Sequence, residues 1–164
     1  MFKVNDYVMY GTTGVCQIDE IKKETFIGDE ELAYYVLHTL YGNPSTIMTP
    51  VHNQKVAMRS IITKEEALAL IEEIHSKEPV WLNDDRKRNE NFTVALKTGN
   101  SETWIQILKS LYHKKKEMAA TGKKLSVSDA NILKSTERLL YEEFSTALNI
   151  PIKEVEAYIL NHIG

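Results

Sequence analysis

The amino-acid sequence predicts an α+β protein in which a small antiparallel β-barrel precedes a compact all-α domain. Residues 6–61 contain short runs with the alternating pattern of half-buried strands, separated by turns rich in glycine and proline. From residue 63 onward, apolar residues recur at helical spacing. The charge changes as well, because residues 1–75 carry six basic and eleven acidic side chains, whereas residues 76–164 carry fourteen and twelve.

Four strands and a candidate fifth are expected in the first part of the chain. They span residues 6–10, 15–21, 32–40 and 45–51, with 55–61 as the fifth. Turns are expected at "GTTG", at "YGNP" and at Gly28, and Pro50 ends the fourth strand. Short antiparallel strands of this number usually curl into a barrel or a bent sheet, because curling hides unpaired edges. The single cysteine, Cys16, has no disulfide partner and is expected to be a small strand residue.

Helices are expected over the rest of the chain. Thr63 and Glu66 form a capping-box pattern at the start of the first one, and Pro79 interrupts the helical pattern after it. Four further helices are predicted at roughly 83–98, 101–118, 126–147 and 151–162. The expected organisation is therefore a β domain over 1–62, a helix and linker over 63–80, and a helical domain over 81–164.

Most apolar residues of these helices are expected to form the core. The stripes with i, i+3, i+4 spacing contain Ile105, Leu108, Leu111, Tyr112, Ile132, Leu133, Leu139, Leu140, Phe144, Ile152, Val155, Tyr158, Ile159 and Ile163. Trp104 lies among them and is expected to be packed. Acidic pairs at helix starts, Asp84–Asp85 and Glu65–Glu66, offset the helix dipole, whereas Glu142 and Glu143 are expected on the solvated surface.

No catalytic or metal-binding constellation is apparent in the sequence. The five histidines are scattered, and no phosphate-binding glycine loop, nucleophile elbow or C-x-x-C motif occurs. We therefore expect a protein that is not an enzyme and needs no metal or cofactor. No apolar run approaches the roughly 18 residues of a membrane span, and the N-terminus lacks a signal-peptide pattern, so a cytoplasmic protein is expected.

Two features point to a partner. "KSLYHKKKEMAATGKK", residues 109–124, holds six lysines and one acid. Such a cluster is either a solvated helix end or, together with Arg86, Lys87 and Arg88, a surface that neutralises DNA phosphates without reading sequence. Trp81 begins the charged stretch "WLNDDRKRNE". Its ring either seals a joint between domains or meets a partner.

The order of several motifs resembles the CarD/CdnL family of bacterial transcription regulators. They are "FKVNDYVMYGTTGVCQIDEI", "YYVLHTLYGNPSTIMTP", a tryptophan before an arginine-rich helix start, "LKTGN", "LKSLYHKKK" and "KKLSVSDANILKSTERLLYEEF". The resemblance spans nearly the whole chain. It implies that the β domain is a Tudor-like barrel that binds the β subunit of RNA polymerase. The helical domain would then touch promoter DNA at the upstream edge of the melted bubble and stabilise the open complex.

The resemblance also implies which residues carry these contacts. Trp81 would be a wedge in the minor groove. The expected phosphate contacts are Arg86, Lys87, Arg88, Lys109, Lys114, Lys115, Lys116, Lys123 and Lys124. The expected polymerase contacts are Thr46, Ile47, Met48, Thr49 and Pro50. The protein would act as a nucleoid-associated monomer that binds promoter DNA largely independently of sequence.

A second interpretation from another functional class stays open at this point. The chain could be a peptide- or protein-binding adaptor that accepts a strand at the edge of its β domain. Its lysines would then be ordinary surface residues without DNA contact. The exposure of Trp81 is the structural feature that bears most directly on the choice.

Overall fold

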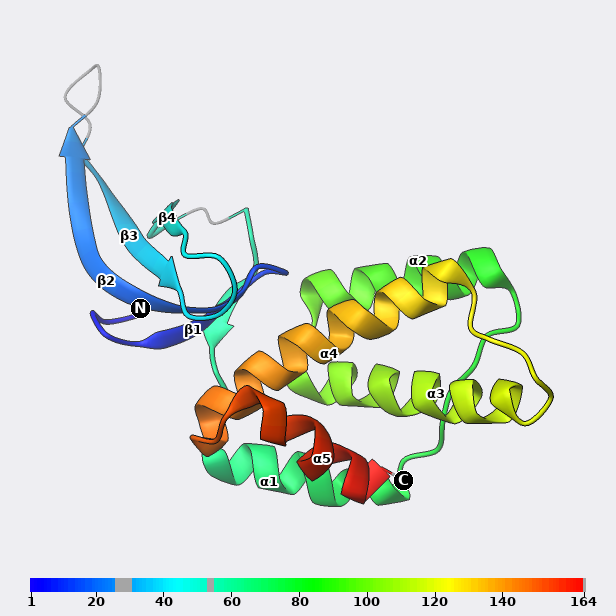
Figure 1. Cartoon of the computed structure of the whole chain (residues 1–164). Helices are drawn as coiled ribbons and strands as arrows, with labels where there is room; N and C mark the ends of the chain where they lie inside the picture. Colours follow the sequence, from blue (N-terminus) through cyan, green and yellow to red (C-terminus); the bar gives the residue numbers. More distant parts are fainter. Residues whose placement is uncertain (26–30, 53–54, 164) are drawn as a thin grey trace. The chain divides into compact units, whose positions relative to one another are not determined.

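The computed structural model describes residues 1–25, 31–52 and 55–163. The chain divides into two compact units, Met1–Ile61 and Ile62–Gly164 (Figure 1). The first unit is an antiparallel sheet and the second is helical. The predicted α+β class is therefore confirmed.

The described residues of the first unit form a five-stranded antiparallel sheet with strand order β4-β3-β2-β1-β5. Its strands are β1 Tyr7–Tyr10, β2 Gly14–Thr25, β3 Glu31–Thr39, β4 Thr46–Pro50 and β5 Met58–Ser60. β2 is longer than predicted because its end continues to pair with β3 as far as Thr25 and Glu31. The expected turn at Gly28 lies outside the described residues. β4 and β5 are the two edges of this open sheet, so closure into a barrel stays a prediction.

One face of the sheet carries the core of the first unit. Val8, Cys16, Ile18, Tyr35 and Leu37 are almost completely buried and pack together. The register shifts between Ile18 and Glu20, which is the signature of a bulge that bends a strand, and Figure 1 shows β2 curving along its length. Cys16 is a buried strand residue, as its position in the pattern predicted.

The second unit contains five α-helices and one short 3₁₀ helix within residues 62–163. They are α1 Lys64–Glu73, η1 Ile74–Ser76, α2 Asp85–Thr98, α3 Ser101–Ala119, α4 Val127–Leu148 and α5 Ile152–Ile163. The capping box of Thr63 and Glu66 is present as predicted, and Asp84 and Ser126 cap α2 and α4. α1, which lies in the segment expected as a helix and linker, packs against α4 and α5.

α4 is the centre of the helical unit and packs against α1, α2, α3 and α5 (Figure 1). The predicted core residues of α3 and α4 are buried or half-buried, and Trp104 is fully packed. The indole of Trp104 lies over Gly99, where an added Cβ would sit 1.9 Å from Nε1. In α5, Val155 and Ile159 are buried, but Ile152 and Tyr158 are 38% exposed and do not belong to the core.

Glu142 and Glu143 were expected on the solvated surface, and this prediction is wrong because both are buried. Glu143 is fully buried: its carboxylate accepts hydrogen bonds from the Ile62 N–H at 2.9 Å and from the hydroxyl of Ser101. It thereby joins α4 to the starts of α1 and α3. Glu142 is also buried and pairs with Arg138 at 3.3 Å. Sequence pattern missed Glu143 because the groups that offset its burial, the Ile62 N–H and the Ser101 hydroxyl, belong to residues distant in the chain.

Candidate nucleic-acid interface

Trp81 lies in an extended segment between η1 and α2 whose backbone is fixed on both sides. The Glu78 carbonyl accepts a hydrogen bond from Gln106 Nε2 at 2.7 Å, and the Val80 N–H donates to Ser110 Oγ at 2.9 Å. Beyond the tryptophan, the Leu82 carbonyl accepts from Arg88 Nη1 at 2.8 Å. A segment without regular secondary structure is therefore held firmly against α3 and α2.

The Trp81 ring is partly exposed and lies among cations. The Arg88 guanidinium carbon is 4.2 Å from the ring centroid, and Lys114 Nζ is 5.4 Å from it. Phe92 meets the ring edge-on at 6.4 Å between centroids. Within the helical unit, therefore, the ring is not enclosed in a core, and it has positive charge beside it.

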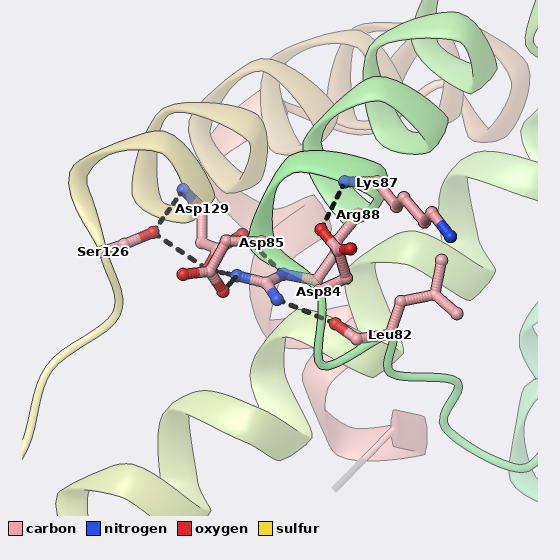
Figure 2. A network of polar contacts seen from close by, with 7 residues as sticks. All are labelled: Leu82, Asp84, Asp85, Lys87, Arg88, Ser126 and Asp129. Atoms are coloured by element: carbon pink, nitrogen blue, oxygen red, sulfur yellow. Dashed lines mark hydrogen bonds and ion pairs between the residues drawn. The ribbon is translucent and has the colours of Figure 1, made fainter.

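Arg88 was expected to contact a phosphate, but its guanidinium is engaged inside the helical unit. Its side chain is only 5% exposed, and Nε and Nη2 donate to the two carboxylate oxygens of Asp129 at 3.1 and 2.7 Å (Figure 2). Nη2 also donates to Asp85 at 2.9 Å. The hydrogen bond to Asp129, with a smaller contribution from Asp85, raises the pKa of Arg88 although burial opposes it. An arginine engaged in this way has no free face for a phosphate.

Lys109 is the second expected contact that the structure removes from the surface. It is 9% exposed, and its ammonium group donates to the carbonyls of Ile74, His75 and Lys77. These carbonyls belong to η1 and the residue after it, where no further helical turn follows to supply backbone N–H donors. The lysine therefore caps a helix end, a role that sequence spacing alone could not reveal.

The remaining predicted cations come from three places in the helical unit. Arg86 and Lys87 begin α2, Lys114–Lys116 lie in the second half of α3, and Lys123 and Lys124 lie in the following loop. Figure 1 shows these three regions at the same end of the unit. All are exposed except Lys114, which is partly covered. Ion pairs of Arg86 with Glu90 and of Lys114 with Glu117 neutralise part of this charge.

A hollow of about 130 Å³ lies beside the Trp81 segment. Val80, Leu82, Phe92 and Ile107 supply apolar walls, and the amides of Asn91 and Gln106 lie among its lining residues. The hollow shares Arg88 and Phe92 with the surroundings of Trp81. Phe92 was not singled out from the sequence. The sequence marks Asp129 only by a cap pattern with Ser126, and the Asp129 N–H donates to Ser126 Oγ while the Asp129 carboxylate binds Arg88.

The predicted polymerase strand is β4, an edge of the sheet that pairs only with β3. Thr46, Met48 and Pro50 are exposed, whereas Thr49 is buried and Ile47 is half-buried. Pro50 has no backbone N–H and therefore suits the end of an edge strand. This alternation places the five predicted residues on two different faces.

The described residues contain no group of three or more histidine, cysteine, aspartate or glutamate side chains that could hold a metal ion. No helix in the described ranges is long and apolar enough to cross a bilayer.

Comparison with known proteins covers both units. Residues 2–62 match the family model described as the CarD-like/TRCF RID domain, and residues 60–160 match the one described as the CarD C-terminal domain. The chain is also 26% identical over 161 residues to a protein of Bacillus subtilis (strain 168) named "Putative transcription factor YdeB". That alignment covers 96% of this chain and 99% of the relative.

Proposed function

The chain belongs to the CarD family, and from that premise we propose that it is a transcription regulator that bridges RNA polymerase and promoter DNA. The β unit would bind the β subunit of the polymerase. The helical unit would bind DNA at the upstream edge of the melted bubble and stabilise the open complex, with Trp81 as the wedge. The single observation that carries this proposal is the partly exposed Trp81 ring on a fixed segment beside cations.

The support for polymerase binding is the β4 edge. An edge strand presents unpaired backbone donors and acceptors that another chain can pair with, and exposed side chains on that strand add selectivity. Thr46, Met48 and Pro50 provide such side chains. We therefore propose that Met48→Glu weakens co-purification of the full chain with core polymerase, whereas Val4→Glu, an equally exposed apolar site elsewhere in the unit, does not.

The support for DNA binding is the combination of an aromatic ring with nearby positive charge. An apolar ring inserted at a base step opposes restacking, and unstacking a step costs a few kcal/mol. Arg86, Lys87 and the exposed lysines would hold adjacent phosphates through contacts that do not depend on sequence. Arg88 and Lys109 are excluded from this set because their charged groups are engaged inside the domain.

The two contacts would reinforce each other, because binding at one makes the other intramolecular at high effective concentration. Neither contact needs to be strong alone. A stabilisation of the open complex by about 1.4 kcal/mol would shift its equilibrium tenfold, and promoters whose bubble closes easily would respond most.

The decisive experiment measures open-complex lifetime with Trp81→Ala. We expect a folded protein that still binds polymerase and a lifetime shortened toward that of polymerase alone. Val94→Ala, at an exposed apolar position of α2, is the matched control and leaves the lifetime unchanged. Loss of folding in Trp81→Ala would show that the ring is a structural plug. An unchanged lifetime would refute the wedge and favour an adaptor without DNA contact.

A second experiment tests the lysines by the salt dependence of DNA binding. Each neutralised phosphate contributes about 0.9 to the slope of log affinity against log salt. Changing Lys114, Lys115 and Lys116 together to Glu should flatten this slope by about one unit for every phosphate that these lysines neutralise in the wild type. The control carries Lys22, Lys23 and Lys55 changed to Glu in the β unit and retains the wild-type slope. A slope unaffected by the first variant would remove α3 from the DNA surface.

A further inference from the structure

We infer that Arg88 is a positioning residue for Trp81: anchored by Asp129, its guanidinium is the surface against which the indole is held. This inference rests on the proposed function, since it concerns how the proposed wedge is kept ready. The observation behind it is that the least exposed cation of the expected DNA-binding set is also the cation nearest to the ring.

Arg88 makes its contacts in two directions at once. The bidentate pair with Asp129 fixes the guanidinium plane to the start of α4, and the bond to the Leu82 carbonyl fixes the residue that follows Trp81 (Figure 2). The same guanidinium lies 4.2 Å from the indole centroid. One side chain therefore holds both the backbone beside Trp81 and its ring.

The physical need for such a residue follows from the location of the tryptophan. Residues 77–84 have no helix or strand to orient their side chains, and a partly exposed ring on such a segment would sample several rotamers. Ordering the ring in advance avoids part of the entropy cost of binding. The planar guanidinium suits this purpose because it can stack on an aromatic face while it donates to a carboxylate, which the ammonium group of lysine cannot do.

Asp129 should contribute more than Asp85 to holding the Arg88 guanidinium against the Trp81 ring. Asp129 is buried and makes two hydrogen bonds to Arg88, whereas Asp85 is 88% exposed and makes one. Water screens the exposed pair and weakens it. Asp85→Asn is therefore a matched control for Asp129→Asn, because the two changes remove one charge each from carboxylates bonded to the same nitrogen.

The test places Arg88→Lys and Asp129→Asn in the wild-type and Trp81→Ala backgrounds and measures open-complex lifetime with full chain and polymerase. We expect each change to shorten the lifetime by roughly three- to tenfold when Trp81 is present, as suits the disruption of a partly desolvated and well-ordered cation–π contact. We expect no further change when Trp81 is absent. Asp85→Asn should have less than about a twofold effect.

The emission of Trp81 gives a readout that does not depend on transcription. The chain has two tryptophans, so subtracting the signal of Trp81→Ala isolates the emission of Trp81 from that of the buried Trp104. Arg88→Lys and Asp129→Asn should increase acrylamide quenching of this emission and lower its anisotropy, whereas Asp85→Asn should not. If the open-complex lifetime does not respond to Trp81→Ala, the proposed function fails, and the emission still tests whether Arg88 orders the ring.

The inference is overturned if either variant shortens the lifetime equally in both backgrounds, or if Trp81 emission is the same with and without the change. Should Arg88→Lys not fold, Asp129→Asn provides the same comparison, because it retains Arg88 and removes its main anchor.

Discussion

Replacing Glu143 by glutamine tests whether this carboxylate is a structural centre of the helical unit. The wild-type carboxylate accepts from the Ile62 N–H and the Ser101 hydroxyl, and its side chain is fully buried. Glutamine keeps the shape but offers one acceptor oxygen and turns an amide donor toward the other partner. Since hydrogen bonds to charged groups contribute about 1.5–3 kcal/mol each, we expect the free energy of unfolding to fall by about 2–4 kcal/mol.

Urea unfolding followed by circular dichroism measures this change. With a slope of about 1–3 kcal/mol/M, the midpoint should decrease by about 0.7 M or more. Glu72→Gln is the matched control, because Glu72 is an exposed helical glutamate of α1, and surface changes of this kind usually stay within about 0.5 kcal/mol. If Glu143→Gln has as small an effect as Glu72→Gln, the burial and bonding assigned to Glu143 are incorrect.

Three further changes probe the helical unit. Burial, with a smaller contribution from Glu156, raises the pKa of Glu137 above its ordinary value of 4.5. The folded state therefore binds the Glu137 proton more tightly than the unfolded state does, and the stability of the protein rises as pH falls toward 4.5. Glu137→Gln should remove this contribution, so the urea midpoint should depend less on pH. Gly99→Ala places a Cβ 1.9 Å from Trp104 Nε1 and should lower stability by about 1–3 kcal/mol in thermal unfolding, and a melting temperature equal to that of wild type would contradict this. Lys109→Met should cost about 1–3 kcal/mol because it removes the ammonium donor that the carbonyls at the end of η1 share. It should leave the salt slope of DNA binding unchanged, and a flatter slope would return Lys109 to the DNA surface.

Local patterns predicted the element types well. The strands of the first unit and the helices of the second lie within a few residues of their expected positions, because alternation and helical spacing report directly on which side of an element is buried. The capping box of Thr63 and Glu66 was readable for the same reason. A cap is a contact between residues three apart, so the sequence contains all of it.

The candidate site was predictable only in part. Trp81 stood out because a large ring began a charged stretch, and the structure leaves that ring partly exposed. Arg88 and Lys109 could not be told from their neighbours by sequence. Arg88 meets a carboxylate 41 residues away, and Lys109 meets a carbonyl 35 residues away.

The amino-acid pattern alone predicts the α+β class, the order of the elements, the capping box at Thr63 and the gathering of positive charge in the second half of the chain. Which charged side chains face solvent and which are buried depends on the packing of the helices. A charge can leave water only where an opposite charge or a set of hydrogen-bonding groups replaces its hydration. Those partners come from other helices, so Asp129 for Arg88, the end of η1 for Lys109, and the starts of α1 and α3 for Glu143 became visible only when the chain was folded.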